Sequence, residues 1–104
     1  MANTIRGRVE LGANGVAQVR LLISHPMTIE MRDAATGRTL PAHYIEEVVC
    51  EHGGEVVFRT DWGQAVSLNP FLQFSLTGVK AGEALSVKWR DNRGATDATS
   101  INIT

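Results

Sequence analysis

Short alternating segments separated by glycine-bearing turns are the feature that most restricts how this chain can fold. Apolar and polar residues alternate in two segments, Phe71–Thr77 and Ala84–Arg90. Alternation with a period of two places one set of side chains on a buried face and the other in water, as in a half-buried strand. The glycines of Gly78–Gly82 lie between the two segments and favour a hairpin bend. We therefore expect these two strands to pair.

The rest of the chain has the same pattern, and helical periodicity is almost absent. Two β-branched stretches flank Gly53-Gly54, which predicts a second hairpin over Ile45–Thr60. Asp61–Pro70 is long enough for a crossover between sheets. Further strands are predicted at Val16–Ser24, Met27–Arg32, a short segment at Leu40, and Ile101–Ile103. Turns are predicted at Asp33–Gly37 and Asp91–Gly94. The prediction is a single all-β domain over residues 1–104, an immunoglobulin-like β-sandwich of seven or eight mostly antiparallel strands.

Composition excludes several classes of function. The formal charge of -1 over 104 residues lacks the basic excess of a nucleic-acid-binding protein. No apolar run approaches the roughly 20 residues of a membrane-spanning helix, and the first residues have no apolar signal core. We expect a chain that is soluble, binds neither nucleic acid nor membrane, and is not exported by a signal of its own.

The candidates for chemistry are few. A metal could be held by His25, His43 and His52 with a carboxylate such as Glu46 or Glu51. The spacing of these residues matches no ligand pattern, so we interpret the histidines as polar loop residues and predict no metal site and no cofactor.

The single Cys50 could act as a nucleophile beside one of the histidines. It shares a strand face with Val48, however, and free cysteine is among the most buried residue types. We therefore expect Cys50 in the core, together with Trp89 and Leu76. Trp62 lies in a loop, where it either plugs an end of the sandwich or contacts a partner, and the plug is favoured.

Four segments, in this order and spread over nearly the whole chain, resemble the SoxZ family: LISHPM from Leu22, PAHYIEEV from Pro41, DWGQAVSLNPF from Asp61 and VKWRDNRG from Val87. SoxZ is the small, non-catalytic subunit of the SoxYZ carrier in bacterial thiosulfate oxidation. The resemblance implies an immunoglobulin-like sandwich that pairs with SoxY and makes transient contacts with other Sox enzymes.

In that family, a carboxy-terminal Gly-Gly-Cys-Gly-Gly arm of SoxY carries the sulfur intermediates as covalent adducts. This chain has no such arm, because its only cysteine lies far from its end. The resemblance also implies a periplasmic location, reached by export in complex with a signal-bearing SoxY.

Residues that a sandwich does not need are the candidates for binding the partner. Two segments combine proline with an aromatic residue where polar turn residues would suffice, and each either binds the partner or packs within its own loop. They supply Pro41, His43, Tyr44 and Ile45 from the first segment, and Asn69, Pro70 and Phe71 from the second. The alternatives are a free-standing immunoglobulin-like binding module and a small metal- or thiol-dependent enzyme.

Overall fold

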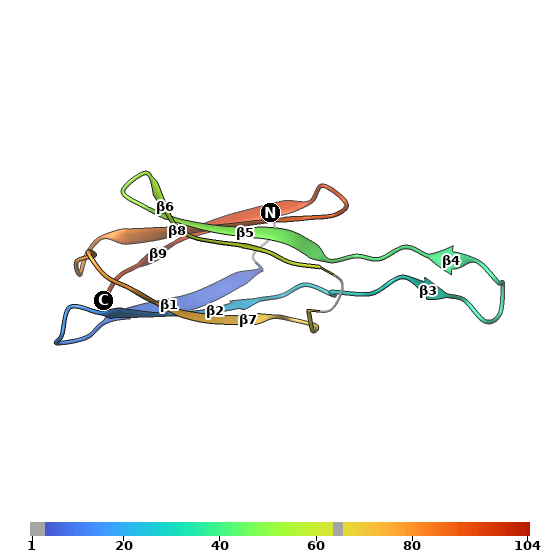
Figure 1. Ribbon diagram of the computed structural model, residues 1–104, viewed down its shortest axis with the longest axis horizontal. Coiled ribbons are helices and arrows are strands. Elements are labelled where there is room, and N and C mark those ends of the chain that lie inside the picture. Colours follow the sequence, from blue (N-terminus) through green and yellow to red (C-terminus); the bar gives the residue numbers. More distant parts are fainter. Residues whose placement is uncertain (1–3, 64–65) are drawn as a thin grey trace.

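The computed structural model describes residues 4–63 and 66–104, and every regular element in this part of the chain is a strand (Figure 1). Among these residues no helix has the length and apolarity needed to span a bilayer. The strands are β1 (Ile5–Leu11), β2 (Ala17–Ile23), β3 (Met31–Arg32), β4 (Thr39–Leu40), β5 (Ile45–His52), β6 (Glu55–Asp61), β7 (Phe71–Leu76), β8 (Ala84–Asp91) and β9 (Thr96–Asn102).

The seven longer strands form two antiparallel sheets with a core between them. One sheet has the order β1-β2-β7 and the other the order β6-β5-β8-β9. The predicted all-β sandwich is confirmed, with two short strands, β3 and β4, outside its two sheets. In an immunoglobulin constant domain the fourth strand joins the first sheet, whereas here the fourth long strand, β6, pairs with β5 in the second.

The predicted pairing of β7 with β8 is wrong. β7 pairs with β2, and β8 lies between β5 and β9 in the other sheet. Leu76 and Leu85 are both buried. Alternation did not determine the pairing, because two strands can bury their apolar faces across the core from each other as well as side by side. The glycine-rich segment between them is therefore a crossover between sheets, with Gly78 and Gly82 at positive φ.

Other local predictions are confirmed. Gly53 and Gly54 form the turn of the β5–β6 hairpin, both at positive φ, where glycine has no steric cost. Asp61–Pro70 connects the two sheets, although two of its residues, 64 and 65, lie outside the described part of the chain.

The core is made by inward-facing residues of both sheets. Trp89 and Leu76 are only 5% and 7% exposed, as predicted. In β5 the pairing register shifts between Ile45 and Glu47. This bulge lets Ile45 and Val48, three residues apart, both point inward.

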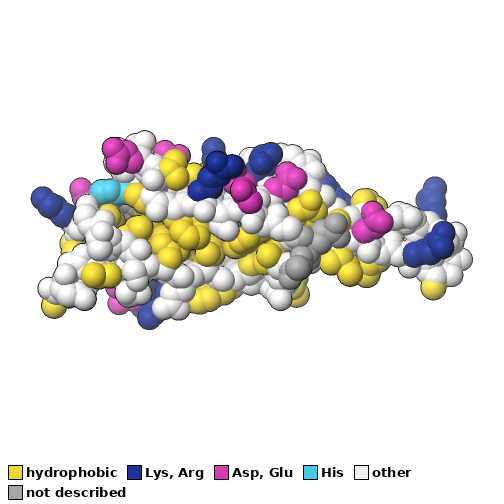
Figure 2. All heavy atoms as spheres, viewed as in Figure 1, with side chains coloured by type: hydrophobic (Ala, Val, Ile, Leu, Met, Phe, Trp, Pro, Cys, Tyr) yellow, Lys and Arg dark blue, Asp and Glu magenta, His cyan; other side chains and the backbone are white. Residues whose placement is uncertain are grey.

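The two long sides of the sandwich are closed differently. On one side a parallel bridge joins Val9 to Ile103. On the other side β6 and β7 are the sheet edges, and stacked rings of Phe58 and Phe74, with centroids 4.1 Å apart, connect them. Figure 2 shows apolar side chains gathered between the two sheets.

A two-stranded hairpin projects from one end of the sandwich (Figure 1). We call residues 28–43 the arm. Its backbone pairs Thr28 with His43 at the base and Met31 with Leu40 further out. The predicted turn at Asp33–Gly37 closes it, with the amide of Gly37 donating to the carbonyl of Asp33 at 2.7 Å.

Candidate functional site

The two predicted partner-binding segments meet at the end of the sandwich from which the arm projects. The amide of Asn69 donates to the carbonyl of His25, and the Oδ1 atom of Asn69 accepts a hydrogen bond from the His25 amide, both at 3.0 Å. On the other side of His25, the amides of Thr28 and His43 each donate to the other residue's carbonyl. We call this region, where residues 24–28, 41–45, 69–71 and 91–93 converge, the arm root.

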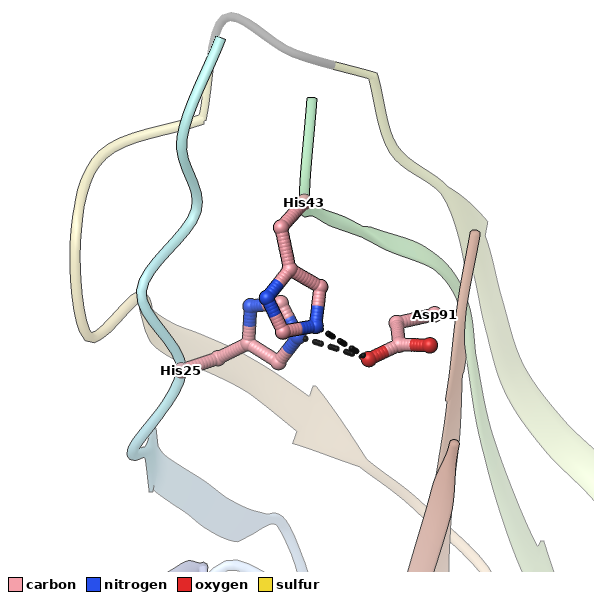
Figure 3. A group of neighbouring side chains, drawn as sticks. All are labelled: His25, His43 and Asp91. Carbon is pink, nitrogen blue, oxygen red and sulfur yellow. Dashed lines mark hydrogen bonds and ion pairs between the residues drawn. The ribbon is translucent and has the colours of Figure 1, made fainter. Parts of the chain in front are cut away.

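A buried carboxylate holds the arm root together (Figure 3). Oδ2 of Asp91 accepts hydrogen bonds from Nε2 of His25 at 3.0 Å and from Nε2 of His43 at 2.8 Å. The rings of the two histidines are in edge contact, and His25 also lies edge-on to Trp89. The network therefore connects the loop after β2, the base of the arm and the end of β8.

Asp91 is 1% exposed and its other oxygen is also satisfied. Oδ1 accepts the backbone amides of Arg93 and Ala95, both at 2.9 Å, which fixes the turn into β9. Burial raises the pKa of Asp91, but hydrogen bonds from the histidines and these amides outweigh it and lower the pKa to about 2.

Asn92 ties the same turn to the second strand of the arm. Its Oδ1 accepts the amide of Tyr44, its own amide donates to the Tyr44 carbonyl, and its Nδ2 donates to the carbonyl of Ala42, all at 2.9 Å. The side chain of Asn92 therefore helps to set the direction in which the arm leaves the sandwich.

His25, His43 and Asp91 are close enough together to suggest a metal site, since one donor atom from each lies within 4.8 Å of the others. The hydrogen bonds of His25 argue against that use. Nδ1 of His25 accepts the amide of Met27 at 3.1 Å, so Nε2 of the neutral ring carries the proton and points it at Asp91. Both ring nitrogens of His25 are therefore engaged, and neither offers the free lone pair that a metal ligand needs.

The three histidines do not converge. Nε2 of His52, the last residue of β5, instead lies 2.8 Å from Oε1 of Glu83. Glu83 belongs to the connection between β7 and β8, away from the arm root. His25 lies in a loop, as interpreted from the sequence, but it is 4% exposed and fully engaged in hydrogen bonds, which the sequence did not predict.

The predicted partner-binding residues differ in how much side chain they offer. Ile45 is fully buried and Pro70 is buried, so their side chains belong to the interior and are removed from the candidate surface. Tyr44 and His43 are partly exposed, and Pro41 and Asn69 are exposed.

Phe71 is the most accessible aromatic among them, with 59% of its surface exposed. It lies opposite Leu22, its cross-strand partner on β2, which is 42% exposed. The two residues form an apolar pair on the outer face of the three-stranded sheet.

Cys50 is fully buried, as expected, and burial raises its pKa to about 12. The thiolate is the reactive form of cysteine, so this thiol has almost no nucleophilic form near neutral pH. Trp62 is partly buried and packs against the core, in agreement with the plug interpretation.

The sequence interpretation missed the role of Asp91, which it assigned only to a turn. It also missed the arm as a projecting element.

One comparison with known proteins identifies a family. The family model described as Sulphur oxidation protein SoxZ matches residues 5–102 of the 104-residue chain. No curated protein matches the chain. The match spans all nine strands, from β1 to β9. The chain therefore belongs to the SoxZ family of the Sox sulfur-oxidation system.

Proposed function

We propose that the chain is the non-catalytic subunit of a SoxYZ-type carrier complex. In this complex it binds and stabilises a SoxY-like subunit whose cysteine-bearing carboxy-terminal segment carries sulfur intermediates. SoxZ is a family of non-catalytic carrier subunits. The observation that carries the proposal is the state of Cys50, the only thiol of the chain, which is fully buried with a raised pKa. Because Cys50 is inaccessible, the proposal assigns the sulfur adduct to a partner chain and the binding of that partner to this one.

The surface at the arm root supports binding to a protein. Phe71 and Leu22 are exposed and adjacent, and Tyr44, partly exposed, lies at the base of the arm. Aromatic side chains at the centre of an interface contribute much of the binding free energy. The hydrogen bonds of Asp91 and Asn92 pre-organise this surface, which reduces the conformational entropy lost on binding.

The proposed location is the periplasm, reached by export in complex with the signal-bearing partner. Cell fractionation tests it with two strains, one encoding both subunits and one in which the partner's signal sequence is deleted. We expect the chain in the periplasmic fraction of the first strain only. Periplasmic chain in both strains would contradict co-export.

Co-expression with a SoxY-like carrier tests the proposed function. We expect the two chains to co-elute in size-exclusion chromatography, at a light-scattering mass equal to a stoichiometric complex. After the complex is loaded with sulfur by its enzymes, intact-mass measurement should place the adduct on the carrier chain and none on this one. A chain that elutes alone as a monomer beside the carrier would indicate a free-standing binding module, and an adduct on Cys50 would indicate thiol chemistry.

A further inference from the structure

The arm has one apolar face. Its two observed backbone pairings, Thr28 with His43 and Met31 with Leu40, have the same register, so side chains two residues apart along a strand share a face. Ile29, Met31 and Leu40 therefore lie on one face, and they are 52%, 50% and 44% exposed.

An apolar face of this kind is poorly stabilised in isolation. Among the described residues, β3 and β4 pair only with each other, as a two-stranded sheet. Two-stranded hairpins are marginally stable in water and need a third strand or a packed surface to become stable. Beyond the root, the described part of the sandwich supplies neither, because the arm extends away from it along the long axis (Figure 1).

The whole chain also exposes more surface than its mass requires. A compact monomer of 11.3 kDa is expected to expose about 5,700 Å². The chain exposes 6538 Å². The excess, about 800 Å², reflects the elongated shape of the chain and is comparable to the area that each partner contributes to a standard protein–protein interface. The radius of gyration, 16.1 Å, likewise exceeds the value of about 13 Å expected for a chain of this length.

The net charge of the arm favours neither an acidic nor a basic partner surface. Two cations, Arg32 and Arg38, are balanced by two anions, Glu30 and Asp33. Figure 2 shows apolar side chains along the arm and basic side chains near its tip. An apolar surface on the partner fits such an element better than a charged one.

We propose that the arm clasps the carrier subunit, with Ile29, Met31 and Leu40 covered by an apolar surface of that chain. This inference rests on the proposed function and adds a contact surface beyond the arm root. His43 is common to both, because it closes the base of the arm and binds Asp91. The network at the root holds the arm in a fixed direction, so the apolar face is presented without a large ordering cost.

Single substitutions on the arm test the clasp. Met31→Glu and Leu40→Glu place a charge on the apolar face, and Val56→Glu is the matched control. Val56 is 58% exposed and belongs to β6, whose hairpin turn lies at the opposite end of the molecule (Figure 1). We expect Kd for the carrier to rise at least about tenfold for each arm variant and less than about twofold for the control. The effect should persist at high salt, because its cause is the desolvation of a buried carboxylate and the loss of apolar contact, which salt screens little.

The outcomes separate the two proposals. If the wild-type chain does not bind the carrier, the proposed function fails. If it binds and both arm variants bind within about twofold of it, the clasp is overturned and the proposed function stands. A wild-type chain that dimerises alone, through contacts that Met31→Glu abolishes, would assign the face to a second copy and overturn the clasp.

A measurement on the unmodified complex covers the case in which a variant does not fold. Amide hydrogen exchange of residues 28–43 should slow when the carrier is added. Unchanged exchange in the arm, with slowed exchange elsewhere on the chain, would overturn the clasp.

Discussion

His25 and Asp91 are joined by a buried hydrogen bond, 3.0 Å between Nε2 and Oδ2, that links the loop after β2 to the last residue of β8. These two strands belong to opposite sheets. Through Oδ2 the same carboxylate also holds His43 at the base of the arm. Asp91 therefore contributes both to the stability of the sandwich end and, together with Asn92, to the direction of the arm.

Asp91→Asn should lower the free energy of unfolding by about 2 to 4 kcal/mol. The amide NH₂ group must face either the two histidine N–H groups or the two backbone N–H groups that Asp91 now accepts. Urea unfolding at pH 7 measures the loss, with exposed Glu55→Gln as the control. A change below about 0.5 kcal/mol would show that the network contributes little to folding.

The stability of the chain should fall as the pH drops from about 4 toward 2. The pKa of Asp91 is lowered from 3.8 to about 2, so folding favours the ionised carboxylate. A lowered pKa stabilises the folded state above the unfolded pKa and loses this contribution as the pH falls through the folded one. The contribution at neutral pH is about 2 kcal/mol.

Unfolding midpoints between pH 5 and pH 2 should therefore fall more steeply for the wild-type chain than for Asp91→Asn. Parallel profiles would show that other carboxylates cause the acid sensitivity.

Trp89→Ala and Leu76→Ala should each cost about 2 to 5 kcal/mol of unfolding free energy. Both side chains are buried, and Nε1 of Trp89 also donates to Oγ1 of Thr4 at 2.9 Å. Thermal and urea unfolding measure the loss, and Val56→Ala, at an exposed position, should be nearly neutral. Equal effects of all three substitutions would contradict the assignment of the core.

Cys50 should resist alkylation in the folded chain. It is fully buried and its pKa is raised to about 12. A reagent therefore cannot reach the sulfur, and the reactive thiolate is scarcely populated. At pH 8 a disulfide reagent such as Ellman's should give less than about one-hundredth of the labelling rate of the urea-unfolded chain. Rapid labelling of the native chain would restore Cys50 as a candidate for sulfur chemistry.

The sequence predicted the strands better than their partners. Alternation in β7 and β8 identified both strands and their buried faces correctly. It did not identify their neighbours, because an apolar face is buried equally well beside another strand or across the core from it. The Gly53-Gly54 turn was predictable because two glycines between β-branched runs define a hairpin locally.

The arm root was predicted only in part. Proline and aromatic residues marked the segments around Tyr44 and Phe71, which the fold brings to one end of the sandwich. Asp91 lies 48 residues from His43, and no local pattern connects the two. The exposure of Ile29 could not be predicted either, since apolar residues next to a turn are equally compatible with a strand inside the sandwich.

The most direct test of the central claim, that this chain acts by binding a carrier subunit at the arm root, is a titration of the carrier with wild-type and Phe71→Ala chains. Phe71 is 59% exposed in the isolated chain, so the substitution should hardly change the melting temperature. We expect saturable binding by the wild-type chain and a loss of about 1 to 3 kcal/mol in the variant. Equal affinity of the two chains, or no binding by either, would contradict the account.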